Sequence, residues 1–295
     1  MSWIVPVLLR IIAAYIVVPL LVKPLMDTYP QRILLLFQFA GCFVLALSVA
    51  LALQQLHIDW RIVAVGLGNG LAAYCHFKAM AISLSRTALF AFWDDLLAMG
   101  LSYVLLREGQ FLNARILLGI GLSVGAVIGF TVHSAHPQPL GEQASTRTPL
   151  RLYLYAGAYS LLLGGSVFFM RYLGVHGTGL GTFLVNWCSG ILGAALLLVL
   201  TSPEAATAIT TLSKRPLVRL GSLSLVTLVA LSAAFMAYRL APQTVVQPLF
   251  LVGEMVAPAV LGLYVFAERN TLDRWEYLYF GLGLAGGLMV ALSFA

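Results

Sequence analysis

Two adjacent carboxylates, Asp94 and Asp95, lie in the otherwise apolar stretch FAFWDDLLAMG (90–100). A third, Glu254, lies in an equally apolar part of the chain. A carboxylate in such a segment could bind a cationic group or a coupling proton, or it could form a structural ion pair with a basic residue such as Arg10. An ionised Asp at the centre of a membrane helix costs about 2.5–3.5 kcal/mol. We therefore expect these groups to face a protein interior or a wet cavity.

The two aspartates cannot both face the same side of a helix, because successive residues point about 100° apart. We expect Asp94 to face the cavity, since it has a counterpart in the second half of the chain, and the facing of Asp95 stays open. Proton coupling is assigned to Glu254, Asp94 and Asp95, and His76 is either a proton relay or a satisfied buried imidazole.

The composition explains what must position these groups. Of 295 residues, 61% are hydrophobic and 9% are charged, whereas soluble domains carry about a quarter charged residues. Apolar runs of about 20 residues, enough to cross a bilayer as helices, recur along the chain and do not alternate as barrel strands would. The sequence thus predicts an all-α integral membrane protein with ten transmembrane helices, near 3–26, 33–54, 62–82, 87–106, 112–132, 151–172, 179–200, 217–239, 244–266 and 275–294.

The acidic residues repeat at a fixed distance. Asp94 precedes Glu108 by 14 residues, and Glu254 precedes Glu268 by the same 14, so that the two pairs superpose at an offset of 160. Glu108 and Glu268 fall at span ends, where structural or gating roles beside Arg107 and Arg269 are expected.

Two further segments repeat in the same order. AAYCHFKAMA (72–81) aligns with AAFMAYRLAP (233–242) at an offset of 161, and an offset of 148 places Lys23 on Arg171 and Gln38 on Asn186. Together the matches predict two five-helix repeats, 1–133 and 151–295, joined by the loop 134–150 within one membrane domain. Since five is odd, the second repeat must enter the membrane from the opposite side, and inverted repeats are typical of secondary transporters.

The symmetric amides Gln38 and Asn186 could bind substrate across the pseudo-dyad or serve as hydrogen bonds between helices. Aromatic rings could line a cavity and face a cation, or they could simply pack. The aromatic candidates for substrate binding are Trp93, Trp187, Tyr74, Phe235 and Tyr159.

The segment from Glu254 to Glu268 resembles the closing pattern of the drug/metabolite transporter superfamily, of the ten-helix EamA-like type. The family's Glu-Pro step is altered, with Met255 after the glutamate and proline only at Pro258, and Ala267 replaces the glycine before the last Glu. The resemblance implies a small-molecule transporter, often an exporter of amino acids, metabolites or cationic drugs.

We therefore expect a secondary-active transporter, an exporter or exchanger, that moves a small polar, cationic or zwitterionic metabolite by alternating access, with or without proton coupling. A flippase for a lipid or lipid-linked head group would share the fold, and an intramembrane lipid-modifying enzyme is a lesser alternative. No enzyme motif, cofactor site or metal cluster is recognised. Three cysteines at no ligand spacing are expected to be reduced packing residues: Cys42, Cys75 and Cys188.

The expected partners are a small-molecule substrate and membrane lipid, and the chain is expected to be a monomer or weak homodimer. The net charge of +6 comes from scattered Lys and Arg, which predicts interfacial anchors and no nucleic-acid binding. The expected location is the plasma membrane, as a multi-pass protein, which is the inner membrane in a bacterium. The distribution of Lys and Arg favours termini outside, whereas the resemblance implies termini inside.

Overall fold

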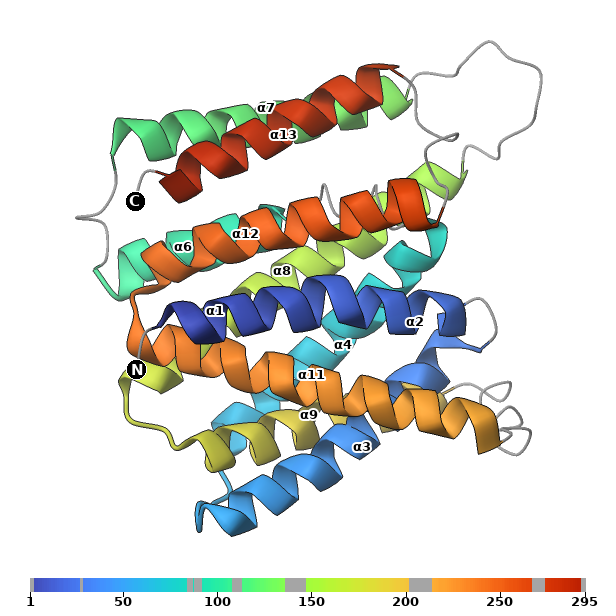
Figure 1. Cartoon of the computed structure of the whole chain (residues 1–295), viewed down its shortest axis with the longest axis vertical. Helices are drawn as coiled ribbons and strands as arrows, with labels where there is room; N and C mark the ends of the chain where they lie inside the picture. Colours follow the sequence, from blue (N-terminus) through green and yellow to red (C-terminus); the bar gives the residue numbers. More distant parts are fainter. Residues whose placement is uncertain are drawn as a thin grey trace.

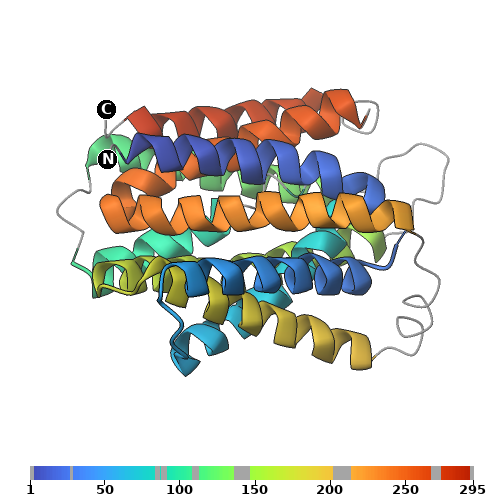
Figure 2. The ribbon, with the colours of Figure 1, turned by 60° about the horizontal axis from the view of Figure 1, so that its bottom comes forward.

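A computed structural model of the chain describes residues 3–26, 29–83, 87, 92–107, 113–135, 147–201, 214–266 and 274–292. In these residues every regular element is a helix, and the helices lie roughly along a common direction (Figures 1 and 2). The helices are α1 (Ile4–Arg10), η1 (Ile11–Val17), α2 (Val18–Met26), α3 (Gln31–Ala52), α4 (Trp60–Ile82), α6 (Phe92–Leu105), α7 (Ala114–Ala135), α8 (Arg147–Val175), α9 (Leu180–Leu200), α11 (Lys214–Leu240), α12 (Gln243–Val260), η3 (Leu261–Val265) and α13 (Arg274–Leu292).

Five helices in the described residues are long and apolar enough to cross a membrane. They are Ile4–Met26, Gln31–Ala52, Leu150–Val175, Leu180–Leu200 and Val218–Leu240. Each coincides with one of the predicted spans. The other five predicted spans fall on α4, α6, α7, α12 with η3, and α13, and their crossing of a membrane stays a prediction.

Large apolar side chains cover much of the outer surface of these helices. Leu200 is 80% exposed, Val104 and Trp60 are each 75% exposed, and Val5 is 65% exposed. Soluble proteins seldom expose apolar side chains over so many elements. The surface is therefore compatible with helices that are surrounded by lipid.

Helices from the two halves of the sequence make close backbone contacts in the interior. A Cβ atom added to Gly66 of α4 would lie 2.6 Å from the Trp187 carbonyl oxygen of α9, and one added to Gly190 of α9 would lie 2.3 Å from the Val63 carbonyl oxygen. Only glycine permits this approach, as is common where membrane helices meet. Helix α9 also packs against α3, so it joins two helices of the first half.

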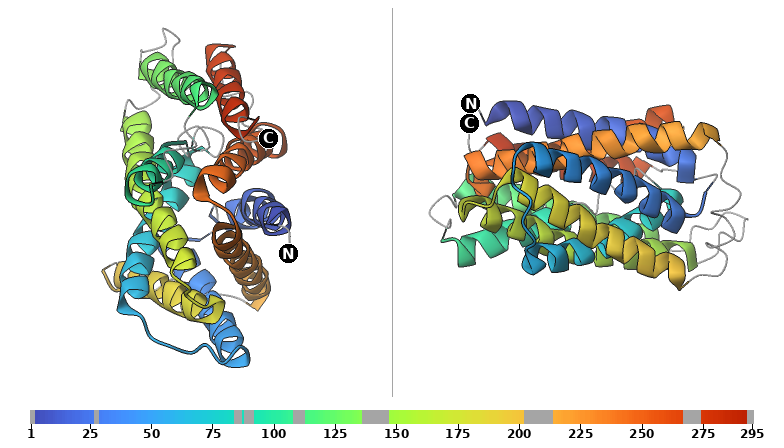
Figure 3. Two further views of the ribbon diagram at one scale, coloured as in Figure 1. Left: turned by 90° about the vertical axis from the view of Figure 1, so that its left-hand side faces the viewer. Right: turned by 90° about the horizontal axis from the view of Figure 1, so that it is seen from below.

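Helices α7 and α13 pack against each other at one edge of the bundle, and α12 links them to the remaining helices (Figure 3). On the other side, α11 packs against α3 and α1, and α4 packs against α8. The polar residues described below come from helices of both halves of the sequence, with the carboxyl groups on α6 and α12.

Two of the helices that surround the site contain prolines and π-helical turns. Pro19 lies in α2, just after the π-helix η1, and Pro258 lies in α12, just before the π-helix η3. Proline has no N–H to donate to the carbonyl four residues earlier, and those carbonyls belong to Tyr15 and Glu254. The regular hydrogen-bond ladder is thus interrupted at two residues that line the site, and π-helical turns often occur at functional sites.

Candidate functional site

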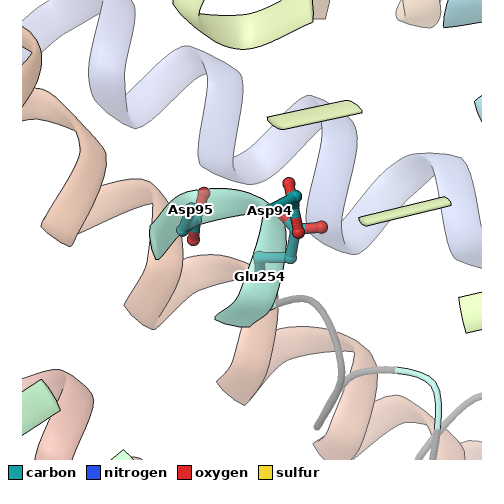
Figure 4. A group of neighbouring side chains, drawn as sticks. All are labelled: Asp94, Asp95 and Glu254. Atoms are coloured by element: carbon teal, nitrogen blue, oxygen red, sulfur yellow. The ribbon is translucent and has the colours of Figure 1, made fainter. Parts of the chain in front are cut away.

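Three carboxyl groups meet inside the bundle. Asp94 and Asp95 occupy the first turn of α6, and Glu254 lies in α12. One oxygen atom from each lies within 4.8 Å of the others, and Figure 4 shows the Asp94 and Glu254 side chains next to one another, with Asp95 farther along the turn. The aspartates are each 1% exposed and Glu254 is 8% exposed. Asp94 and Glu254, which superpose at an offset of 160 residues in the sequence, thus lie close together in the structure.

Glu254 is held by tyrosines from two other helices. The Tyr159 hydroxyl of α8 donates a hydrogen bond of 2.7 Å to Glu254 Oε1, and the Tyr15 hydroxyl of η1 interacts with the same carboxyl group. His76 of α4 stacks on the Tyr159 ring, with a centroid separation of 4.3 Å. The glutamate is therefore fixed in orientation, while Pro258 leaves its backbone carbonyl without the usual helical donor.

Asp95 belongs to a separate chain of hydrogen bonds. Its Oδ1 accepts from Gln247 Nε2, and Gln247 Oε1 accepts from the Tyr238 hydroxyl. The Tyr238 carbonyl in turn accepts from the Arg171 guanidinium. The chain links the carboxyl cluster to the ends of α8 and α11.

A cavity of about 170 Å³ lies beside the cluster. Ligand pockets of drug-sized molecules are larger, at roughly 300–1,000 Å³, so in this conformation the cavity suits a small solute. Its polar or aromatic lining residues are Arg10, Tyr15, Gln38, Asn69, His76, Thr87, Tyr159, Thr227 and Glu254. Glu254 lines the cavity, whereas Asp94, which was expected to face it, and Asp95 are not among the lining residues.

The cavity contains both signs of charge. Arg10 of α1 lines it together with Glu254, and its guanidinium lies over the Tyr15 ring at 5.3 Å from the centroid. Among the residues that the structure describes, the ion pair found within 4.0 Å is Asp59 with Arg61, and neither residue lines the cavity. Arg10 therefore faces the cavity rather than forming a direct salt bridge with Glu254.

Four of the predicted site residues line the cavity: Glu254, Gln38, Tyr159 and His76. Gln38 is buried, and its Nε2 donates to Thr227 Oγ1 at 2.7 Å. Thr227, from α11, also lines the cavity, so this hydrogen bond places the glutamine against the cavity wall.

The other aromatic candidates lie outside the cavity lining. Trp93 is 38% exposed at the surface. Phe235 stacks on Phe183 at 4.2 Å, and Trp187 packs against the same Phe183. Tyr74 accepts a hydrogen bond of 3.3 Å from Arg32 Nε. Their positions fit packing and interhelical contact.

Asn186 is also placed away from the cavity, unlike its sequence counterpart Gln38. Its Nδ2 donates to the His57 carbonyl at 2.6 Å and to the Thr182 carbonyl at 2.7 Å. Its Oδ1 accepts from the Asp59 backbone N–H at 3.1 Å. Asn186 thus fastens the segment before α4 to α9, which is the interhelical role left open from sequence.

Several polar residues of the site were missing from the predicted set of binding residues, among them Arg10, Tyr15 and Gln247. One signal was available, because Tyr15 and Pro19 have the same spacing as Glu254 and Pro258. Nothing in the local sequence marked Gln247. Glu108 and Glu268, together with most of the loop 134–150, lie outside the described residues.

No protein-family model and no curated protein sequence matches the chain. The fold is found among solved structures. One of them, described only as "Crystal structure of protein", has a TM-score of 0.63 and 13% sequence identity, and the match covers 98% of this chain and 95% of that one. At this identity the likeness establishes the fold alone.

Proposed function

We propose that this protein is a secondary transporter of the drug/metabolite type, with ten transmembrane helices in two inverted five-helix halves, which moves a small cationic or zwitterionic solute by alternating access. The observation that carries the proposal is the cavity lined by Arg10 and Glu254. It lies within a bundle of helices whose outer surfaces are largely apolar. Charged residues inside such a bundle typically mark a substrate or ion pathway, and ligand sites are concave pockets with a few polar groups.

The charges in the cavity support the choice of solute. The Glu254 carboxylate would face an ammonium or other cationic group, and the Arg10 guanidinium would face a carboxylate if the solute has one. The ring of Tyr159 adds an aromatic surface that favours positive charge. The cavity volume of about 170 Å³ restricts the solute to a small molecule in this conformation.

Matched contacts between helices support the division of the chain into two five-helix halves. Helix α4 packs against α9 and α8, and its proposed counterpart α11 packs against α3 and α1, which are the counterparts of α9 and α8. The Ser123 hydroxyl of α7 hydrogen-bonds with the Gly283 carbonyl of α13, across a separation of 160 residues. This separation equals the sequence offset, as expected for counterparts that meet on a pseudo-dyad.

The direction of the helices supports their inversion. Each helix of the second half runs opposite to its counterpart: α8 to α1 and α2, α9 to α3, α11 to α4, α12 to α6, and α13 to α7 (Figure 1). An exchange of the two halves' conformations would then open the cavity to the other side of the membrane.

The decisive experiment is a thermal-shift panel followed by transport in liposomes. Purified protein would be screened against amino acids, amines and other water-soluble metabolites in one arm, and lipid-like amphiphiles in the other. A bound solute should raise the melting temperature through linkage, and the same solute should then exchange across liposomes that contain the protein.

The alternatives give different outcomes in the same experiment. Protection by amphiphiles alone, with movement of labelled lipid between leaflets, would replace the metabolite transporter with a flippase. A chemical change in a lipid head group, with no movement of solute, would identify a membrane enzyme instead.

A further inference from the structure

We propose that Asp94, Asp95 and Glu254 form a binding site for one divalent cation of calcium's size, placed behind the cavity wall and sharing Glu254 with it. The binding of the ion is independent of transport. Its use as a coupling ion rests on the function proposed above.

The spacing of the ligand atoms is compatible with calcium. One carboxyl oxygen from each residue lies within 4.8 Å of the others. Calcium binds oxygen at roughly 2.3–2.6 Å, so oxygens on opposite sides of the ion are about 4.6–5.2 Å apart, whereas the bond length of about 2.0–2.1 Å for magnesium gives about 4.0–4.2 Å. Carboxylate oxygens are also the ligands that hard divalent ions prefer. The three groups could hold calcium with little movement of the helices.

Two oxygens of the cluster lack a hydrogen-bond partner. In the part of the chain that the structure describes, Asp94 Oδ1 and Asp95 Oδ2 are buried without one, and both residues are 1% exposed. Buried acceptors are nearly always satisfied, because leaving one unpaired is costly. By contrast, Asp95 Oδ1 already accepts from Gln247 Nε2. The unpartnered oxygens are therefore available to a ligand, and a metal cation can satisfy both of them.

The charges nearby match a divalent ion. When all three carboxyl groups of the site are ionised, as they would be on a bound metal ion, they and the guanidinium of Arg10 carry a net formal charge of minus two. One divalent cation balances this net charge, so that no further basic residue from the described part of the chain is needed.

The position of the aspartates favours a bare ion over an organic cation. Asp94 and Asp95 are not among the residues that line the cavity, whereas Glu254 is. An amine in the cavity would therefore reach Glu254 and leave the aspartates uncompensated. An inorganic ion requires almost no volume, so it can lie between Glu254 and the aspartates.

Calcium binding to the purified full-length chain in detergent provides the test. Terbium, a luminescent ion of similar size and oxygen preference, would be the second probe, because Tyr15 and Tyr159 beside Glu254 can sensitise its emission. We expect saturable binding of one calcium per chain, and terbium emission that excess calcium removes and equal magnesium does not. Asp94→Asn and Glu254→Gln should each weaken calcium binding by about tenfold or more, because the number of charged ligands sets calcium affinity.

Asp59→Asn is the matched control, since it makes the same chemical change at a residue that contacts Arg61 outside the cluster, and it should leave calcium binding unchanged. Size-exclusion profiles would verify that each variant is folded. If Asp94→Asn does not fold, Glu254→Gln tests the same site from α12.

The outcomes separate this inference from the proposed function. Folded protein that exchanges solute but binds no calcium, or binds it equally well in both cluster variants, overturns the ion site and leaves the transporter in place. Calcium binding that the cluster variants weaken, in a protein that moves no solute, supports the ion site and overturns the transporter.

Discussion

Lys23 and Arg171 make similar contacts at opposite ends of the helix bundle. The Lys23 ammonium donates to the Met80 carbonyl at 2.7 Å, near the end of α4, and the Arg171 guanidinium donates to the Tyr238 carbonyl, near the end of α11. Helices α4 and α11 end at opposite sides of the bundle (Figure 1). The two contacts are similar in kind, and each of them satisfies a carbonyl near a helix end.

These two contacts should contribute similarly to stability. Hydrogen bonds that involve a charged group contribute about 1.5–3 kcal/mol. We expect Lys23→Met and Arg171→Met, which keep an apolar stem, each to lower the free energy of unfolding by an amount in that range. Thermal unfolding in one detergent measures both effects. Loss of stability in only one variant would show that the two contacts are not equivalent.

Replacement of Glu254 tests whether the buried carboxylate takes part in transport. Glu254→Gln keeps the shape and a hydrogen-bonding head but cannot titrate, so we expect it to abolish pH-driven accumulation of solute. The protein should stay folded and could become more stable, because the cost of burying a charge disappears. Asp94→Asn should have a smaller effect of the same kind. If Glu254→Gln unfolds the protein and transport per folded molecule is unchanged, the glutamate is structural.

Gln38 and Asn186, paired in the sequence, should behave differently. Asn186→Ala removes the partner of the His57 carbonyl and of the Asp59 N–H, and a typical intramolecular hydrogen bond contributes about 0.5–1.5 kcal/mol to stability. We expect it to reduce stability without a change in solute preference. Gln38→Ala, beside the cavity, should alter the solute that protects the protein in a thermal-shift panel. The opposite assignment of effects would return Asn186 to the binding site.

Two glycines of one helix offer a matched pair. Gly66→Ala should destabilise by about 1–3 kcal/mol, the usual cost of overpacking, since the new methyl group would meet the Trp187 backbone. Gly68 has nothing within 4 Å of the added methyl position, so Gly68→Ala should be neutral or stabilise by up to about 1 kcal/mol through helix propensity. Melting temperatures of the two variants decide the matter. Equal effects would mean that α4 and α9 are not in backbone contact.

The loop before α4 should give a small acid dependence. A hydrogen bond from the Arg61 side chain holds the pKa of Asp59 below its ordinary value, which is about 3.9. Stabilisation from this group is thus complete above the ordinary pKa and is lost as the pH falls through the lowered one. The effect should be modest, because the Arg61 side chain is 79% exposed. Asn also caps helices well, so Asp59→Asn should remove the acid-dependent part of the melting curve and keep the cap.

The sequence predicted the helical fold and the meeting of Asp94 with Glu254, but not which aromatic rings face inward. A soluble helix shows its buried face as an apolar stripe. Here both lipid and interior are apolar, so the pattern around Trp93 does not distinguish the surface from the core. Its neighbour Asp94 is 1% exposed, whereas Trp93 is 38% exposed. The sequence could therefore indicate an inward-facing position only for the charged residue, Asp94.

Symmetry was also a partial guide to the site. It paired Gln38 with Asn186, and both are buried amides in helices that pack against each other. However, the two ends of the bundle have different neighbours: Thr227 faces Gln38, while the segment before α4 faces Asn186. A duplicated sequence predicts equivalent places in the fold, and the residues around each place decide its role.

The backbone contact between α4 and α9 has a consequence for how the chain is made. Proteins emerge from the ribosome N-terminus first, so α4 is complete about a hundred residues before the end of α9, its closest partner. Until then the surface around Gly66, which takes the Trp187 carbonyl in the finished protein, has no partner. The first half must therefore remain an unfinished assembly until α9 is made, and a stop or delay in synthesis before Leu200 should expose it to quality-control proteases.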